Sequence, residues 1–147
     1  MIRRFGEPPQ HHRNYRVRVG AYALLPRNGK LLLTCQSDPA PDIQLPGGGL
    51  DAGESPVQAL HREVFEETGW KIGQPRKVGT FRRFVFMPEY DLWAEKICHI
   101  YVARPVLCLS DPTEPAHRAL WLSASDAVDV LGNSGDQHFA RLLIGTI

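Results

Sequence analysis

The stretch GGLDAGESPVQALHREVFEETGW, residues 48–70, joins a glycine-rich loop to a segment that carries the signals of an α-helix at both ends. Ser55 begins a capping box with the glutamine three positions later, and Pro56 suits the first helical turn. Gly69 can adopt the left-handed conformation with which many helices end. The sequence therefore predicts a helix over residues 55–68.

Three glutamates fall on one side of this predicted helix. At about 100° per residue, Glu63, Glu66 and Glu67 share a sector about 100° wide. The apolar stripe next to this sector consists of Val57, Leu60 and Val64. Carboxylates at this spacing repel one another by roughly 2–3 kcal/mol per pair at an effective dielectric of about 20. Water and salt, pairing with Arg62, or a hard divalent cation would offset that repulsion. Because no His or Cys joins the sector, a cation there would be Mg²⁺, Mn²⁺ or Ca²⁺ rather than zinc.

The loop before the helix contains three consecutive glycines, Gly47, Gly48 and Gly49. Glycine has no Cβ and tolerates positive φ, so the backbone of this loop can approach a ligand closely. A glycine-rich turn beside a carboxylate-bound cation can hold phosphate groups, with the metal neutralising their charge. On its own such a loop is more often only a turn, and its spacing from the helix decides between the two interpretations.

That spacing resembles the Nudix box, G-x5-E-x7-R-E-U-x-E-E-x-G-U, in which U is a bulky aliphatic residue. The matching positions are Gly48, Glu54, Arg62, Glu63, Val64, Glu66, Glu67 and Gly69. Trp70 departs from the pattern, since it is bulky and apolar but not aliphatic. The resemblance implies an α/β fold of the Nudix type, an α/β/α sandwich with a mixed β-sheet. It also implies Mg²⁺- or Mn²⁺-dependent hydrolysis of a nucleoside diphosphate linked to another group.

The resemblance further implies a role for each matching residue. The expected metal ligands are Glu63, Glu66 and Glu67, with Glu54 and the backbone carbonyl of Gly48 as further candidates. Arg62 and Glu54 are expected to form a pair that orients the metal-binding carboxylates. The three loop glycines are expected to bind substrate.

The expected reaction is attack of water on a phosphorus of a diphosphate bridge, with cations lowering the pKa of the water and a carboxylate taking its proton. The box does not fix which carboxylate acts as the general base. Glu66 and Glu67 are candidates, as is an acid from another loop. The leading outside candidate is Glu114, followed by Glu89 and Glu95, and ordinary surface acids are the alternative for all three.

The substrate beyond the diphosphate is less constrained. The stretch FRRFVFMPEYDLW, residues 81–93, places Arg82 and Arg83 among aromatic residues that can stack on a base or meet phosphates. An ordinary amphipathic strand pair with an aromatic core face would show the same pattern. Two other functions remain open. One is an RNA 5′-end pyrophosphohydrolase, which the basic amino end favours, and the other is a Nudix-fold binding module without catalysis.

The rest of the chain predicts mainly strands before and after the central helix. Alternation from Tyr15 to Leu25 predicts a strand, and Asn28-Gly29 predicts a hairpin that pairs it antiparallel with residues 31–36. Further strands are expected at 43–45, 77–86, 95–109 and 118–122, a polar turn region at 87–94, and helices at 123–131 and 136–145. We expect an irregular arm over residues 1–14 and a single domain over residues 15–147, with a mixed sheet covered on both faces.

The composition limits the classes of protein to which this chain can belong. The 147 residues are 43% hydrophobic and 22% charged, which suits one globular domain, and the net charge of +1 gives no general attraction to nucleic acid or membrane. Three cysteines, none in a C-x-x-C pair, predict neither a disulfide framework nor a thiolate zinc site. No apolar run approaches the roughly 18 residues of a membrane span. We expect a cytoplasmic monomer or homodimer that acts on a small molecule.

Overall fold

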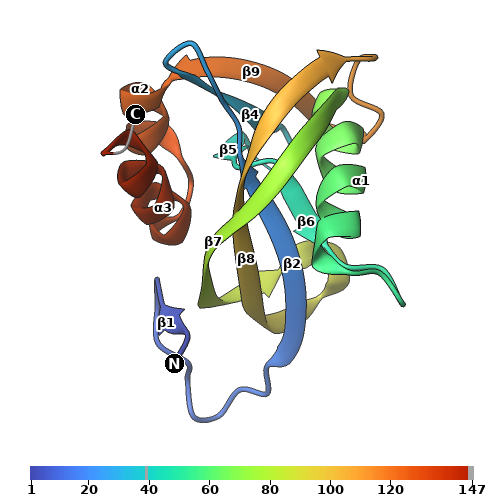
Figure 1. Cartoon of the computed structure of the whole chain (residues 1–147). Helices are drawn as coiled ribbons and strands as arrows, with labels where there is room; N and C mark the ends of the chain where they lie inside the picture. The colour runs from blue at the N-terminus through green and yellow to red at the C-terminus, as the bar shows by residue number, and fades with distance from the viewer. Residues whose placement is uncertain (39, 146–147) are drawn as a thin grey trace.

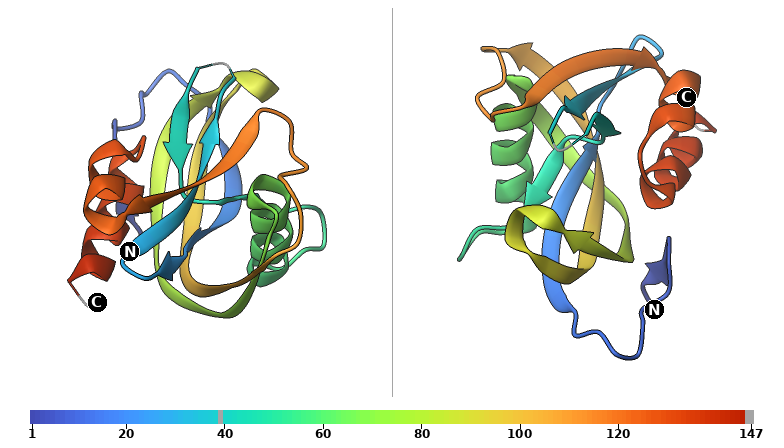
Figure 2. Two further views of the ribbon diagram at one scale, coloured as in Figure 1. Left: turned by 90° about the horizontal axis from the view of Figure 1, so that it is seen from above. Right: turned by 180° about the vertical axis from the view of Figure 1, so that it is seen from behind.

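Helices cover both faces of a β-structure in this computed structural model, which describes residues 1–38 and 40–145. Helix α1 (Pro56–Thr68) lies on one side of the strands, and helices α2 (Ala124–Val130) and α3 (Ser134–Ile144) lie on the other (Figures 1 and 2). This arrangement confirms the expected sandwich of helices around a mixed sheet. Among the described residues, no helix is long and apolar enough to cross a membrane.

The strands form two sheets. The larger sheet has the order β1-β7-β8-β2-β6 and the smaller one is built on β4, which pairs with β3, β5 and β9. The strands of the larger sheet are β1 (Arg3–Arg4), β2 (Arg16–Leu24), β6 (Gly47–Gly49), β7 (Trp70–Met87) and β8 (Leu92–Cys108). Those of the smaller sheet are β3 (Pro26–Arg27), β4 (Lys30–Gln36), β5 (Asp42–Gln44) and β9 (His117–Ser123). A short 3₁₀ helix, η1 (Pro88–Tyr90), connects β7 to β8.

The first long strand pairs differently from the prediction. The hairpin forms at Asn28 and Gly29, whose φ angles are 52° and 77°, but it joins β3 to β4. Strand β2 instead belongs to the larger sheet, where it runs parallel to β8 and antiparallel to β6. The predicted antiparallel pair is therefore wrong for β2, because the chain changes sheet at Leu25.

Two other predicted boundaries move. Strand β7 begins at Trp70 instead of residue 77. The register of its ladder with β8 shifts at several points, one of them between Gly73 and Arg76, and the pairing continues on both sides of each shift. The amino-terminal segment is not wholly irregular, since β1 pairs in parallel with β7. Phe5 then packs edge-on against Phe81 with ring centroids 5.5 Å apart, which attaches the arm to the core.

Each face of the larger sheet has its own apolar core. The core under α2 and α3 includes Leu24, Leu33, Phe81, Ile100, Val128 and Phe139. The core under α1 includes Ala21, Leu32, Leu60, Val64, Ile72 and Tyr101. Val57 was expected in the apolar stripe of α1, but it lies in the first turn and is exposed, and Ala59 is buried in its place.

Candidate active site

The ends of α1 are fixed by the predicted caps. The Ser55 hydroxyl accepts a hydrogen bond from the backbone N–H of Gln58 at 3.1 Å, and the Ser55 N–H donates to the Gln58 side chain at 2.8 Å. At the other end Gly69 has φ 79°, and its N–H donates to the carbonyl of Phe65. These caps set where the helix begins and ends. They thereby set which glutamates face strand β6.

Strand β6 lies against two of these glutamates. The backbone N–H of Gly47 donates to Oε1 of Glu67 at 3.0 Å. A Cβ at Gly48 would stand 2.6 Å from the carboxyl carbon of Glu63, and a Cβ at Gly47 would stand 2.1 Å from the carbonyl oxygen of Ala21. Gly47, which has a φ of 148°, therefore requires glycine, whereas a side chain at Gly48 would displace the Glu63 carboxylate. The backbone of these two residues forms one wall of the carboxylate site.

Arg62 connects the loop to the acidic face of the helix. Its Nε and Nη2 atoms donate to the two carboxylate oxygens of Glu54, each at 2.8 Å. Nη1 donates to Glu63 at 2.9 Å and to Glu66 at 3.3 Å, and Nη2 also donates to the carbonyl of Gly49 at 3.0 Å. The expected contact between Arg62 and Glu54 is thus present. The hydrogen bonds from Arg62 lower the pKa of Glu54 to about 2.

The remaining glutamates are less well compensated. Burial raises the pKa of Glu63, against the effect of Arg62, and burial raises the pKa of Glu67 well above its usual value. The charges of Glu63, Glu66 and Glu114 raise the pKa of Glu67 further, and the hydrogen bond from the Gly47 N–H lowers it. The Nε2 atom of His117 lies 3.8 Å from Glu67, but burial lowers the pKa of this histidine, so its ring is neutral at pH 7. The negative charge of these carboxylates is only partly balanced, and their donor atoms are all oxygens. Such a group of ligands suits a hard divalent cation.

The carboxylates do not converge on one point. Among residues 1–38 and 40–145, no group of three His, Cys, Asp or Glu side chains has the spacing of a metal site. Arg62 holds both oxygens of Glu54 and one oxygen each of Glu63 and Glu66, while Gly47 holds Glu67. Arg62 leaves one oxygen of Glu63 and one oxygen of Glu66 unbonded, so a cation need not displace Arg62 to bind these two carboxylates. Glu54 is the least available of the candidates as a ligand, because Arg62 bonds both of its oxygens.

A cavity of about 750 Å³ opens in front of this wall. The predicted site residues that line it are Gly47, Gly48, Gly49, Glu63, Glu67, Glu114, Glu89 and Arg83. Glu54, Arg62 and Glu66 do not line it. Arg62 connects Glu54 and Glu66 to Glu63, which does. Of the four glutamates predicted as ligands, Glu63 and Glu67 thus face the cavity. The other two, Glu54 and Glu66, do not face it and are bonded to Arg62.

Among the outside base candidates, Glu114 is the one tied to the catalytic helix. The backbone N–H groups of Thr113 and Glu114 both donate to the carbonyl of Glu66 at 2.8 Å. This double contact holds the loop against the last turns of α1, so that Glu114 lines the cavity beside Glu63 and Glu67. Glu95 does not line the cavity and pairs with Arg82 at 3.4 Å.

The two adjacent arginines of β7 separate to opposite faces of the sheet. Arg83 lines the cavity, whereas Arg82 lies on the other face with Glu95. Only one of the two predicted substrate arginines can therefore reach a ligand in this cavity. Further polar residues that the sequence pattern did not single out also line it, among them Arg18, Tyr22, Lys96, His117 and Asp136.

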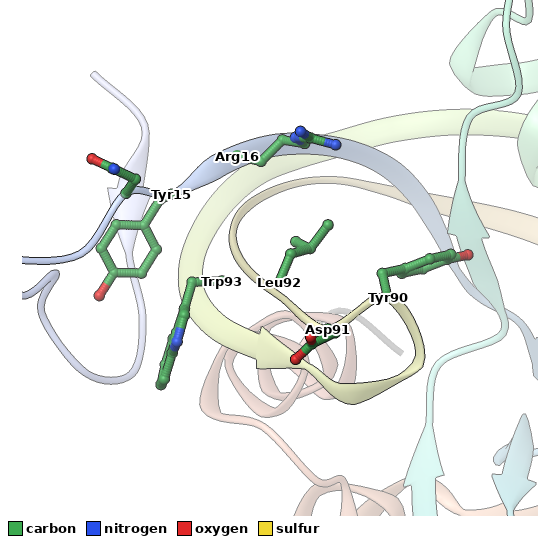
Figure 3. A pocket seen from close by; sticks show the side chains of 7 residues that line it. Tyr15, Arg16, Tyr90, Asp91, Leu92 and Trp93 are labelled. Carbon is green, nitrogen blue, oxygen red and sulfur yellow. The ribbon is translucent and has the colours of Figure 1, made fainter.

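A second pocket, of about 690 Å³, lies between the amino-terminal arm and the turn from β7 to β8. Figure 3 shows Tyr15 and Trp93 on one side of it and Tyr90 on the other. Asp91 is the single carboxylate among its lining residues, and none of the helix glutamates reaches it. Tyr90 lines both cavities, so the second pocket adjoins the first but lacks its chemistry.

Solved structures with the same fold cover most of the chain. A NUDIX hydrolase from Nitrosomonas europaea superposes with a TM-score of 0.69 at 22% identity, covering 84% of this chain and 85% of that one. A MutT protein from Bacillus halodurans gives a TM-score of 0.69 at 21% identity, covering 84% and 80% of the two chains. At these identities the likeness shows the fold alone.

Curated relatives match over shorter stretches. A putative 8-oxo-dGTP diphosphatase from Bacillus subtilis is 34% identical over 74 residues, which is 50% of each chain. An RNA pyrophosphohydrolase from Acidiphilium cryptum is 48% identical over 59 residues, 37% of this chain and 35% of that one. The matched region thus spans half or less of these relatives. The model of the NUDIX domain, in contrast, matches residues 14–143, and the chain belongs to this family.

Proposed function

We propose that this protein is a Mg²⁺- or Mn²⁺-dependent pyrophosphohydrolase that cleaves the diphosphate of a nucleoside diphosphate linked to another moiety. The observation that carries the proposal is the wall formed by the β6 glycines and the poorly compensated carboxylates of Glu63 and Glu67, which faces a cavity large enough for a nucleotide. The relatives named as diphosphatase and pyrophosphohydrolase support the same bond type.

The oxygen-only donor set fits Mg²⁺ or Mn²⁺. Glu63 and Glu67 would hold the metal from the cavity wall, and the Gly48 carbonyl is a backbone candidate. Glu66 would join them through the oxygen that Arg62 does not bond. Glu54 is better placed to keep Arg62 in position, because Arg62 occupies both of its oxygens. When bound, the metal would lower the pKa of the attacking water and neutralise phosphoryl oxygens.

The chain's own residues supply the other steps. The Gly47 N–H orients Glu67 by bonding one of its oxygens. Arg62 holds the helix carboxylates in a fixed relation to the loop. A carboxylate facing the cavity then takes the proton of the attacking water, and we assign this role to Glu114, whose loop is held by the Glu66 carbonyl. Glu66 and Glu67 are the alternatives within the helix.

A panel of diphosphate compounds, incubated with Mg²⁺ or Mn²⁺ and with products identified by mass, tests the reaction. We expect Glu67→Gln to abolish nearly all hydrolysis while the circular dichroism spectrum stays unchanged. Glu7→Gln, the same change on the exposed arm, is the matched control and should turn over normally. Near-normal turnover by Glu67→Gln would refute the metal assignment.

The base assignment needs its own measurement. Removing a general base costs about 10²–10⁴ in rate, so Glu114→Gln should lower kcat by that factor with little change in the metal dependence. Such a loss of kcat with an unchanged metal dependence in Glu66→Gln or Glu67→Gln, and a normal kcat in Glu114→Gln, would move the role to the helix.

A second candidate is an RNA 5′-end pyrophosphohydrolase. It is favoured by relatives of that name, such as the one from Acidiphilium cryptum, and by the arginines of the amino-terminal segment. It would use the same carboxylates on a larger substrate. Binding of 5′-triphosphate RNA that weakens steeply with salt would support it, and hydrolysis restricted to free nucleotides would exclude it.

A further inference from the structure

Three cations stand in one row across the floor of the cavity. Arg18 on β2 pairs directly with Lys96 on β8, and Lys96 pairs with Arg83 on β7. Residues that pair directly on adjacent strands share one face of a sheet, and neighbouring strands lie only about 4.8 Å apart. Arg18, Lys96 and Arg83 all line the cavity, so the row faces its interior.

Like charges directly opposite one another destabilise a sheet, and little in the protein offsets this row. Among the described residues, none of the three forms an ion pair within 4.0 Å; the pairs that do form involve Arg62, Arg82 and His117. The Arg18 guanidinium lies 4.5 Å from the ring centroid of Tyr90. Such a contact leaves its positive charge unneutralised.

One buried acid faces the row. Asp136 on α3 is influenced electrostatically by both Arg83 and Lys96 and also accepts a hydrogen bond from the backbone of Leu45. Lys96 in addition bonds the Tyr22 hydroxyl. Asp136 can balance one of the two charges of Arg83 and Lys96, which leaves an excess of positive charge at these two residues. An isolated base offers no charge to balance such an excess, whereas an anion does.

The row lies close to the proposed diphosphate site. Arg18 is two residues before Gly20, which pairs with Gly49 of the glycine strand. Two residues of a strand span about 7 Å. This is roughly the length of one sugar or phosphate unit of a nucleotide. The cavity therefore has an acidic end, suited to a metal-bound diphosphate, and a basic floor one group further on.

We propose that Arg18, Lys96 and Arg83 form an anion subsite that binds a further phosphate on the substrate, beyond the diphosphate that is cleaved. This inference rests on the proposed function and narrows its substrate class to compounds with an additional phosphate on the attached moiety. The planar guanidinium of Arg83 and the ammonium of Lys96 supply charge-assisted hydrogen bonds to phosphate oxygens.

Direct binding without hydrolysis tests the subsite. We would titrate the protein in EDTA with AMP and with adenosine by calorimetry. With no cation bound, the carboxylates repel phosphate, so a gain in affinity from the phosphate reports on the basic row. We expect AMP to bind at least about tenfold more tightly than adenosine, and this difference should shrink as salt is added.

Two variants and a matched control locate the effect. Arg83→Gln and Lys96→Gln should each weaken AMP binding about tenfold or more and leave adenosine binding unchanged. Arg82→Gln removes the same charge from the neighbouring residue on the opposite face, and it should bind AMP like the wild type. Circular dichroism and thermal unfolding check that each variant is folded. Equal affinities of the wild type for AMP and adenosine, or wild-type AMP binding by both variants, would overturn the inference.

Measurements of hydrolysis test the anion subsite separately from the proposed hydrolase function. With Mg²⁺ present, kcat/KM for NADPH and NADH compares two diphosphate compounds that differ by one phosphate. We expect a preference for NADPH that Arg83→Gln reduces. Hydrolysis in the panel without any effect of the row on AMP binding would refute the subsite alone. Row-dependent AMP binding without hydrolysis of any compound would refute the proposed function alone.

Discussion

Asp136→Asn is expected to stabilise the protein, and by an amount that depends on pH. Asp136 is 5% exposed, and its N–H is bonded to the Asn133 side chain at 2.9 Å. Burial raises the pKa of its carboxyl group from 3.8 to about 6, even though Arg83, Asn133 and Lys96 act in the opposite direction. Asparagine keeps the size and an acceptor oxygen but removes the charge that the interior solvates poorly.

The sign follows from where the proton is held. Between pH 3.8 and about 6, the folded protein keeps a proton on Asp136 that the unfolded chain has released. The free energy of unfolding therefore falls as pH rises through this window. A pKa difference of about two units corresponds to about 3 kcal/mol, at roughly 1.4 kcal/mol per unit, fully developed above pH 7.

Urea unfolding of both proteins from pH 4 to pH 8 measures this effect. The free energy of unfolding of Asp136→Asn minus that of the wild type should be small near pH 4 and rise by up to about 3 kcal/mol by pH 7. Taking the difference removes the contributions of all other titrating groups that the two proteins share. Asp126→Asn, the same change at an exposed carboxyl in the first turn of α2, is the matched control.

A flat difference for Asp136→Asn would refute the reasoning. A wild type that gains stability over the variant as pH rises would refute it more strongly. It would mean that Arg83 and Lys96 stabilise an ionised Asp136 more than burial destabilises it. The row of cations would then already be neutralised from within the protein, and the case for an external anion would weaken with it.

Three further substitutions test the frame of the site. Ser55→Ala removes the cap of α1 and should lower the free energy of unfolding by about 1 kcal/mol in urea. Gly69→Ala places a Cβ 1.7 Å from the carbonyl oxygen of Ser110 at a φ of +79°, so we expect a loss of at least about 2 kcal/mol, and an unchanged midpoint would contradict the observed turn. Arg62→Lys loses the double hydrogen bond to Glu54 and should lower kcat more than it raises KM, because the lysine cannot hold loop and helix together; a change in KM alone would indicate a direct role in substrate binding.

Local features of the site could be predicted from the sequence. The caps of α1 depend on residues a few positions apart, so Ser55 and Gly69 were sufficient to place the helix. The glutamate sector follows from helical geometry in the same way. The sequence did not show that Arg62 holds Glu63 and Glu66, because a helical wheel gives directions but not which hydrogen bonds form.

Long-range features were less accessible. The alternating pattern of β2 indicates two faces, but any strand with a matching face would satisfy it, so the pairing with β8 could not be inferred. Arg82 and Arg83 had to point to opposite sides, since side chains alternate along a strand, yet which one faces the cavity depends on how the whole sheet is oriented. Val57 on α1 is a further example. It continues the apolar pattern of Leu60 and Val64, but it is exposed, because the pattern does not show where the buried face of the helix ends.

The contact between the Glu66 carbonyl and the loop at Thr113 and Glu114 determines how freely the residue at position 114 can change. Both bonds are made by the main chain, so they form with any side chain at these two positions except proline, which has no N–H to donate. The helix thus presents whatever residue stands at position 114 to the same part of the cavity. A substitution at position 114 would therefore not require the carboxylate wall to rearrange. A single substitution there could change the catalytic or recognition group of the site.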